Sequence, residues 1–345
     1  MKGSINMKKV FALILIFVFT LCATSCGSLF GGSNYNFYYA SPEDYSSGNT
    51  TVEDASKLAK IHLSWYSGNV TIETHDSPTV IIEETADGVS DDAHKVHHFY
   101  QTLNDGDVLF VAFGKSGVKD YDGINKDLKI TLPQNDGYYF GITSDSANIS
   151  IDVSTYENTL DKLSITTESG AVHANVDSAK TVQIAGYGDD VGPSENRIYE
   201  LNAKGTVYSL GMNSSYAKVL ISAEEVGSMD NVGSVFNETR FSVKKANVVK
   251  ITCTKGESFI KVEEFNSMEL TMREKPVYIT IPENSEFTLN KTKDKAFDDE
   301  LVSDLVDIGF DGVQKLNDNK YTVSGGEKII NILTHNEIHI NPIEN

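Results

Sequence analysis

The chain has few cysteines, and this scarcity excludes a fold that is held together by disulfide bonds. Its 345 residues contain three, Cys22, Cys26 and Cys253, and the first two lie close to the N-terminus. If the N-terminal segment is processed, Cys253 has no second cysteine to pair with. It stands in a run of alternating apolar residues, where a lone cysteine usually acts as a small buried hydrophobic side chain.

Positive charge is scarce as well. The chain carries 29 lysines and arginines against 49 acidic residues, which gives a formal net charge of −20 at pH 7. Such a surface repels nucleic acids and anionic lipids, so we exclude nucleic acid as a partner. The arginines, Arg197, Arg240 and Arg273, are scattered, whereas a lyase acting on acidic sugars needs cations that neutralise its substrate. The composition therefore argues against that class of enzyme.

Long apolar runs are missing except at residues 10–21, and no second run could cross a membrane. Three lysines precede this run, and small residues follow it directly before Cys26. A charged start, an apolar core too short for a comfortable membrane span and a small-residue end are typical of a secretory signal peptide. We expect residues 1–25 to be this signal.

The residues before Cys26 resemble the lipobox of bacterial lipoproteins, although Ala23 stands where leucine is commonest. The resemblance implies that the signal is cleaved before Cys26 and that this cysteine is acylated. The mature protein would then be extracytoplasmic and lipid-anchored to the bacterial cell membrane. The alternatives are a soluble secreted protein and an apolar helix that is left in place as an anchor.

Residues 26–57 contain few aliphatic residues and no periodic apolar pattern. A segment rich in serine, glycine and asparagine cannot bury a core, so we expect a flexible tether behind the lipidated cysteine. Its tyrosines have two interpretations: they stack on sugars, or they dock against the first strands. These tyrosines are Tyr35, Tyr38, Tyr39 and Tyr45.

Sustained helical periodicity is absent from most of the remaining chain, and short alternating segments take its place. Residues 163–174 show the repeating unit: apolar and polar residues alternate up to a Glu-Ser-Gly turn, and Val172 then begins a second alternating run. Similar turn units lie at residues 67–72 and 146–151. The recurrence of strand, turn and strand predicts a stack of equivalent layers.

We therefore predict an all-β fold over residues 58–345, with a β-solenoid of short stacked strands as its architecture. An antiparallel β-sandwich is the alternative, because each segment could equally be one arm of a hairpin. In the solenoid, Ile149 and Val172 would face a shared interior, while Asp145 and Glu168 would lie on exposed turns.

One segment departs from the strand pattern. Within residues 296–310, Phe297, Leu301, Leu305 and Ile308 recur at helical spacing. We expect a short helix or an irregular loop here, which would project from the stack with its acidic residues in solvent.

Several motifs recur in the predicted solenoid. Ser-Gly-x-Val turns occur at Gly68 and Gly170, strands run into Pro133 and Pro282, and the chain ends with apolar segments at residues 325–334 and 338–340. Together these motifs resemble a bacterial family of extracytoplasmic domains of unknown function, known as putative adhesins. The resemblance covers the chain from about residue 58 to its end and implies a β-solenoid fold. The family has no catalytic residues to carry over, so the resemblance implies a fold and a compartment but no activity.

Five potential metal ligands cluster in the first third of the chain: Asp91, Asp92, His94, His97 and His98. Their spacing fits no metal motif. In a strand, His97 and His98 would point to opposite faces, so a zinc site would need another ligand from elsewhere. We interpret these histidines as exposed loop residues.

A second group superficially resembles a calcium loop, namely Asp120, Asp122, Gly123, Asn125 and Asp127. It lacks the glutamate and the order of acids that an EF-hand requires. We therefore predict no metal site and no cofactor. The sequence also has no serine nucleophile elbow, phosphate-binding loop or zinc-protease helix, and we assign no catalytic residue.

These features predict a lipid-anchored protein of the cell envelope that binds, adheres or scaffolds without catalysis. Its partners would be the membrane, through the lipid anchor, and a wall polymer, a glycan or an envelope protein. Two alternatives stay open: an enzyme that processes polysaccharides, since 49 acids could include a catalytic pair, and an envelope-stress sensor that acts through a partner. Two carboxylates paired in a cleft would favour the enzyme.

Overall fold

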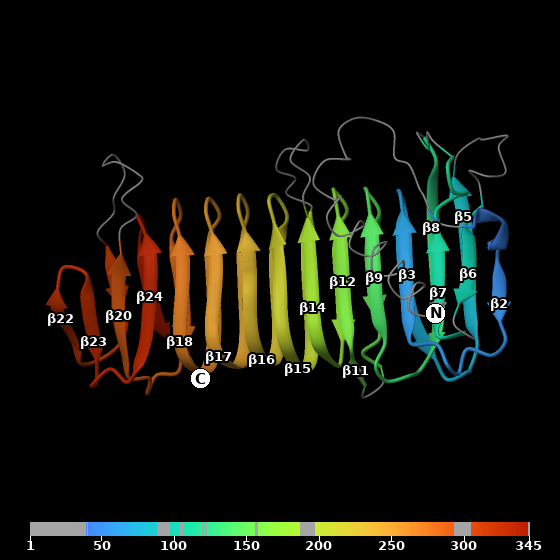
Figure 1. Ribbon diagram of the computed structural model, residues 1–345. Helices are drawn as coiled ribbons and strands as arrows, with labels where there is room; N and C mark the ends of the chain where they lie inside the picture. The colour runs from blue at the N-terminus through green and yellow to red at the C-terminus, as the bar shows by residue number, and fades with distance from the viewer. Residues whose placement is uncertain are drawn as a thin grey trace, which may run out of the picture.

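The computed structural model describes residues 39, 41–87, 97–103, 106–118, 121, 123–155, 158–186, 197–292 and 305–343. These residues form an elongated stack of strands (Figure 1), and the strands belong to one 25-stranded sheet. The predicted all-β fold is confirmed, and helical structure among the described residues is limited to short 3-10 turns such as Pro42–Asp44. In these ranges no helix has the length and apolar character needed to span a bilayer.

The repeating layer is a rung of two strands joined by a tight turn. One rung contains β9 (Tyr139–Ser144) and β10 (Asn148–Asp152), and the next contains β12 (Lys162–Thr167) and β13 (Val172–Val176). β9 pairs in parallel with β12, and β10 pairs in parallel with β13. Successive rungs in parallel register are the arrangement of a β-solenoid, which is the architecture that the sequence predicts.

The recurring turn units lie on neighbouring rungs. β4 (Asn69–His75) pairs in parallel with β10, which pairs on its other side with β13. The units at residues 67–72, 146–151 and 163–174 therefore belong to three consecutive layers of the stack.

Long strands join the rungs in the middle of the stack. They are β15 (Ile198–Ser214), β16 (Lys218–Ser234), β17 (Thr239–Cys253) and β18 (Ser258–Met272). β15 pairs through Tyr199 with β13 and through Leu210 with β14 (Ser178–Gly186), so its two halves lie in different faces of the stack. β11 (Thr159–Leu160) and β19 (Val277–Ile281) continue the parallel pairing on β14 and β18. A bend in each long strand thus connects the two faces.

The N-terminal end of the stack does not follow the order of the sequence. β3 (Lys60–Trp65) lies between β7 (Val108–Ala112) and β9, and β4 lies between β8 (Asn125–Pro133) and β10. Antiparallel strands then cover these two edges: β6 (Phe99–Leu103) pairs with β7, and β5 (Val80–Asp87) pairs with β8. β1 (Ser46–Ser47) and β2 (Thr50–Val52) add an outer strand to β6 and to β5.

The C-terminal end has the same arrangement. β24 (Lys328–Thr334) lies between β18 and β20 (Phe287–Thr292), and β25 (Ile338–Pro342) lies between β19 and β21 (Val306–Ile308). β23 (Lys320–Val323) pairs in antiparallel fashion with β20 and with β22 (Val313–Asn317), which Figure 1 shows at the far end of the stack. Antiparallel strands thus cover the parallel edges of β7, β8 and β20, which another chain could otherwise extend.

The described part of residues 296–310 is not helical. Val306–Ile308 is the strand β21, which pairs in parallel with β25. Backbone pairing in this outer rung therefore overrides the helical spacing of Leu305 and Ile308. Residues 296–304 lie outside the described residues.

Folded structure begins before residue 58. β1 and β2 pair with β6 and β5, and Ala55 is buried in the core. The Tyr39 hydroxyl donates to the carbonyl of Gly114 at 3.3 Å, and its ring centre lies 4.0 Å from that of Tyr45. The prediction of a flexible tether is therefore wrong for residues 41–57, where strand pairing and burial hold the chain on the stack. Of the two interpretations of the tyrosines, Tyr39 and Tyr45 therefore fit the second, in which they dock against the folded chain.

One apolar core fills the stack. Ile149 is 1% exposed and Val172 is fully buried, which confirms the predicted shared interior. Cys253 is buried as predicted, and this burial raises the pKa of its thiol. Asp145 and Glu168 lie on turns but are only partly exposed, so the prediction of exposed turn acids is correct in position and overstates their exposure.

Buried hydroxyl groups hold the turns between the two strands of a rung. The Thr167 Oγ1 accepts a hydrogen bond from the backbone N–H of Gly170 at 3.0 Å, and the Ser214 Oγ accepts one from Ala217 at 2.8 Å. The same inward position is occupied on other rungs by Ser144, Ser234 and Thr334. Each hydroxyl satisfies a backbone donor that would otherwise be buried without a partner, which explains why serine and threonine recur before the turns.

Candidate functional site

Several predicted site residues lie outside the described residues. They are the signal at residues 1–25, the acylated Cys26, the potential ligands Asp91, Asp92 and His94, and the acids Asp120 and Asp122. Acylation of Cys26 therefore stays a prediction. Among the residues that are described, no group of three or more histidines, cysteines and acids is placed to hold a metal ion.

His97 and His98 meet at one buried carboxylate. The Nδ1 of His98 lies 3.0 Å from Oε2 of Glu84, and the Nδ1 of His97 lies 3.3 Å from Oε1 of the same residue. His97 is exposed, but the side chain of His98 is fully buried. The interpretation of His98 as an exposed loop residue is therefore wrong, because its imidazole packs against an acid inside the N-terminal strands.

Glu84 also faces a buried lysine. The Nζ of Lys126 lies 3.9 Å from Oε2 of Glu84, and it lies 4.0 Å and 5.6 Å from the ring centres of Phe113 and Trp65. It also donates to the backbone carbonyl of Phe113. Burial lowers the pKa of Lys126 to about 8, against the attraction of Glu84. The side chain of Lys126 has no exposed surface, so this cluster joins strands and offers no ligand site.

Within the described part of the calcium-like group, the side chain of Asp127 links neighbouring rungs. The Oδ1 of Asp127 accepts hydrogen bonds from the backbone N–H and the Nδ2 of Asn69, at 3.0 Å and 2.8 Å. The Oδ1 of Asn69 in turn accepts one from Asn148 at 3.2 Å. The carboxylate therefore extends a ladder of amide side chains across three rungs.

One pair of acids does come together, on the turns. The side chains of Asp145 and Glu168 are hydrogen-bonded, and burial raises the pKa of Asp145. The backbone N–H of Ser169 donates to the Asp145 carbonyl at 2.8 Å, which ties the two turns together. A glycosidase places its two carboxyl groups at least about 5 Å apart, on either side of the bond to be cleaved. Two groups in direct contact leave no room for that bond, so this pair is a link between turns.

A row of aromatic side chains lies on the outward face formed by β17, β18, β19 and β25. Phe259 and Tyr278 stack with their ring centres 5.0 Å apart, and Tyr278 and His339 stack at the same distance. Arg240 covers the next position at 4.9 Å from Phe259, and Asp307 lies beside His339 at the other end. A sugar stacks on a free ring face. In this row the neighbours occupy those faces, so the row stabilises the stack.

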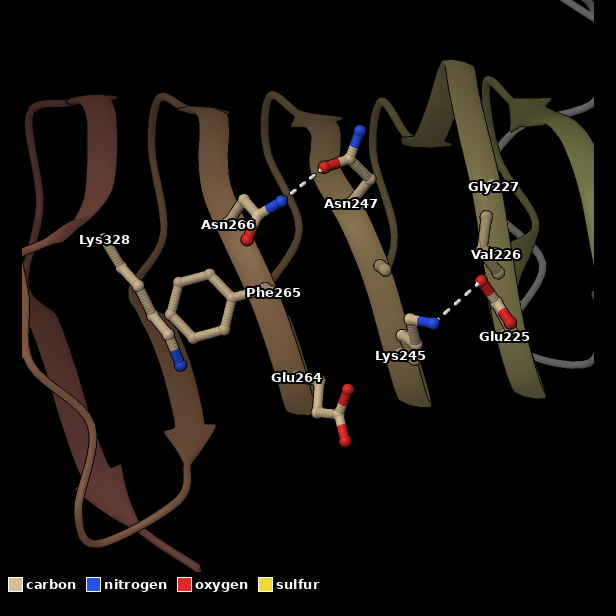
Figure 2. A pocket seen from close by; sticks show the side chains of 10 residues that line it. Glu225, Val226, Gly227, Lys245, Asn247, Glu264, Phe265, Asn266 and Lys328 are labelled. Carbon is tan, nitrogen blue, oxygen red and sulfur yellow. Dashed lines mark hydrogen bonds and ion pairs between the residues drawn. The ribbon is translucent and has the colours of Figure 1, made fainter.

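A groove of about 400 Å³ crosses the bends of β16, β17 and β18 and reaches β24 (Figure 2). Buried Val226, Ala246 and Phe265 lie at its base. Two outward rows of side chains form its walls. One row contains Glu225, Lys245 and Glu264, and the other contains Gly227, Asn247, Asn266 and Lys328.

The groove is electrically balanced in a strongly acidic molecule. The Nζ of Lys245 lies 3.5 Å from Oε1 of Glu225, and the Nζ of Lys328 lies 4.7 Å from the ring centre of Phe265. Glu225 and Glu264 match these two lysines, whereas the whole chain carries a net charge of −20. The groove therefore suits a neutral ligand better than it suits a polyanion.

The amide side chains of the second row have unused hydrogen-bonding groups. Asn266 donates through its Nδ2 to the Oδ1 of Asn247 at 2.7 Å, and both residues are exposed (Figure 2). This leaves the Nδ2 of Asn247 and the Oδ1 of Asn266 without a partner among the described residues. One donor and one acceptor are thus available for hydrogen bonds with hydroxyl or amide groups of a ligand.

The sequence predictions did not include this groove. Glu225, Lys245 and Glu264 recur at a spacing of roughly twenty residues, which is the spacing of the repeat itself. That spacing could have shown that the three side chains form one row. It could not show that the row borders a hollow, because the hollow depends on how the long strands bend.

Comparison with known proteins finds no matching protein-family model and no matching curated protein. A putative adhesin from Parabacteroides merdae is 10% identical over 87% of this chain and 97% of its own, with a TM-score of 0.41. A putative adhesin from Bacteroides fragilis is 11% identical over 86% and 97%, with a TM-score of 0.31. A putative cell adhesion protein from Clostridium sporogenes is 13% identical over 87% and 100%, with a TM-score of 0.18.

These neighbours carry the name of the family that the sequence motifs resemble.

Proposed function

We propose that the protein is a lipid-anchored binding or scaffolding module of the bacterial cell envelope and that the groove holds its ligand. The observation that carries this proposal is the amide row, in which the Nδ2 of Asn247 and the Oδ1 of Asn266 face solvent beside a charge-balanced hollow. Acylated Cys26 would hold the protein at the outer face of the membrane. A wall polymer, a glycan or an envelope protein is the partner.

The direction of the groove suits an extended ligand. Neighbouring strands lie ~4.8 Å apart, so the four strands that line the groove extend over about 15 Å along the stack. A polymer lying in this direction would contact several rungs at once. Repeated weak contacts then add up to useful avidity, even where each single contact is weak.

The acids of the groove support binding without catalysis. An acid that protonates a glycosidic leaving group has to stay protonated, which usually requires an apolar pocket. The side chain of Glu225 is 39% exposed and pairs with Lys245, and Glu264 is exposed on the far side of the same lysine. A stress sensor that acts through a partner gains no support from any particular residue of the described chain.

The test is to screen the full chain against wall polymers, glycans and envelope extracts while product formation is monitored in the same assays. The variant Asn247→Ala/Asn266→Ala should lose the ligand that the unaltered chain binds. A matched control is Asn290→Ala/Asn331→Ala, which removes another hydrogen-bonded asparagine pair, at 2.9 Å, outside the groove. Cleavage of a glycan that is abolished by changing Glu225 or Glu264 would overturn the non-catalytic proposal.

A further inference from the structure

The outward row that forms the amide wall of the groove is interrupted at one rung. From β24 back to β15 this row contains Lys328, Asn266, Asn247, Gly227 and Tyr208. Gly227 has no side chain, so one rung of the row is empty between Asn247 and Tyr208. A Cβ atom at Gly227 would lie 2.7 Å from the backbone carbonyl oxygen of Tyr208. The close approach of the two strands therefore keeps this position free of any larger residue.

Tyr208 stands beside this gap with an unusually exposed ring. It is 59% exposed, more than any other large hydrophobic side chain in the described part of the chain, and it has no ring partner there. Other outward aromatic residues do stack on the next rung: Tyr216 on Phe236 at 4.9 Å, and Phe259 on Tyr278 at 5.0 Å. The rung that would supply such a neighbour to Tyr208 is the one that holds Gly227.

The gap has the dimensions of one ring. Tyr208 and Asn247 are two strands apart, which is about 9–10 Å, and the rings of neighbouring rungs stack at about half that distance. A ligand ring above Gly227 would therefore contact Tyr208 on one side and the free Nδ2 of Asn247 on the other.

The chemistry of this arrangement favours a sugar ring. A pyranose has an apolar C–H face that stacks on a tyrosine ring, and its hydroxyl groups both donate and accept hydrogen bonds at an amide row. Nucleic acid bases would arrive with a phosphate backbone that a chain of net charge −20 repels. An acidic sugar polymer would meet the same repulsion, whereas a neutral one would not.

We propose that the groove binds a neutral polysaccharide, with one pyranose ring stacked on Tyr208 above Gly227 and the following units lying along Asn247 and Asn266. This proposal rests on the proposed binding function, and it names the class of ligand. Tyr208 is the residue that selects a ligand with a ring at this position, and the asparagines fix the direction of the polymer.

Calorimetric titration of the full chain tests this assignment. The neutral probes are soluble oligomers of N-acetylglucosamine and of β-linked glucose, and polygalacturonate is the acidic probe. The chain should bind at least one neutral oligomer and not polygalacturonate. Tyr208→Ala should weaken binding about tenfold or more, and Tyr208→Phe should retain affinity because it keeps the ring. Phe236→Ala, which removes an exposed aromatic ring outside the groove, should leave affinity unchanged.

The outcomes separate this proposal from the one on which it rests. If Tyr208→Ala binds a neutral oligomer normally while Asn247→Ala/Asn266→Ala does not, ring stacking is overturned and the binding groove stands. If polygalacturonate or an envelope protein binds and the neutral oligomers do not, the ligand class is overturned while the binding function stands. If no wall polymer, glycan or envelope extract binds, both proposals fail.

Discussion

Ile149 lies directly beside Val172 in the parallel pairing of β10 with β13, and both side chains point into the same core. The column continues on either side, with Val70 next to Ile149 and Tyr199 next to Val172. Each inward side chain is thus buried by the equivalent side chain of the rung above and the rung below. In such a stack, stability comes from contacts between neighbouring layers.

Val172→Ala should lower the free energy of unfolding by about 1–4 kcal/mol, because it removes two methyl groups from a fully buried position. Glu168→Ala should be close to neutral. Glu168 is only half-buried and lies on a turn, so its truncation opens no cavity in the core. Urea unfolding of the two variants measures the difference. Equal losses would show that the assigned inward and outward positions are wrong.

The alternating residues predicted the layers of the middle of the stack well, and they could not predict its ends. A strand that alternates shows which side chains face the core, but it does not show which strand it pairs with. β3 and β24 each pair on both sides with strands that are not their neighbours in the sequence, and alternation carries no information about that choice. The same limit explains the error at Val306–Ile308.

Buried charges were equally hard to predict. In the sequence, Lys126 alternates in step with Leu128, so both lie on the inward side of β8, yet a lysine is normally placed outside. Its acidic partner Glu84 is brought in by antiparallel pairing of β5 with β8, and His98, which directly precedes β6, lies against the same carboxylate. The groove depends in a similar way on tertiary structure, since the bends of the long strands leave no periodic mark in the sequence.

Ser214→Ala should lower the free energy of unfolding by about 1–3 kcal/mol, because it leaves buried backbone donors at Tyr216 and Ala217 without an acceptor. Ser214→Thr should be tolerated better, since Thr167 and Thr334 already occupy the same inward position on other rungs. Thermal unfolding of the two variants makes the comparison. A threonine variant as unstable as the alanine variant would show that hydroxyl capping is not what the turn needs.

Cys26→Ala should abolish acylation, because acylation of a lipoprotein needs the cysteine thiol that follows the signal. Growth of the producing bacterium with a labelled fatty-acid analogue should mark the unaltered protein and leave the variant unmarked. Cys253→Ala is the matched control, since that thiol is buried in the folded chain and should not contribute to labelling. Equal labelling of the Cys26 variant and the unaltered protein would contradict the lipid anchor.

Lys126 should make the protein more stable as the pH rises from 7 to 9.5. The folded protein releases the proton of Lys126 at a pKa of about 8, while the exposed lysine of the unfolded chain keeps it up to its usual value of 10.5. Between these values the unfolded state binds more protons, so the free energy of unfolding increases with pH. The expected gain by pH 9.5 is about 2 kcal/mol.

The comparison of two lysine variants isolates this effect from the other groups that titrate in the same range. Urea unfolding at pH 7 and pH 9.5 should give a smaller increase, or none, for Lys126→Met, because methionine carries no proton to release. Lys250→Met removes an exposed lysine from β17 and should behave like the unaltered chain. If all three proteins change in parallel between the two pH values, Lys126 is not held as a buried cation beside Glu84, and its place in the N-terminal core has to be revised.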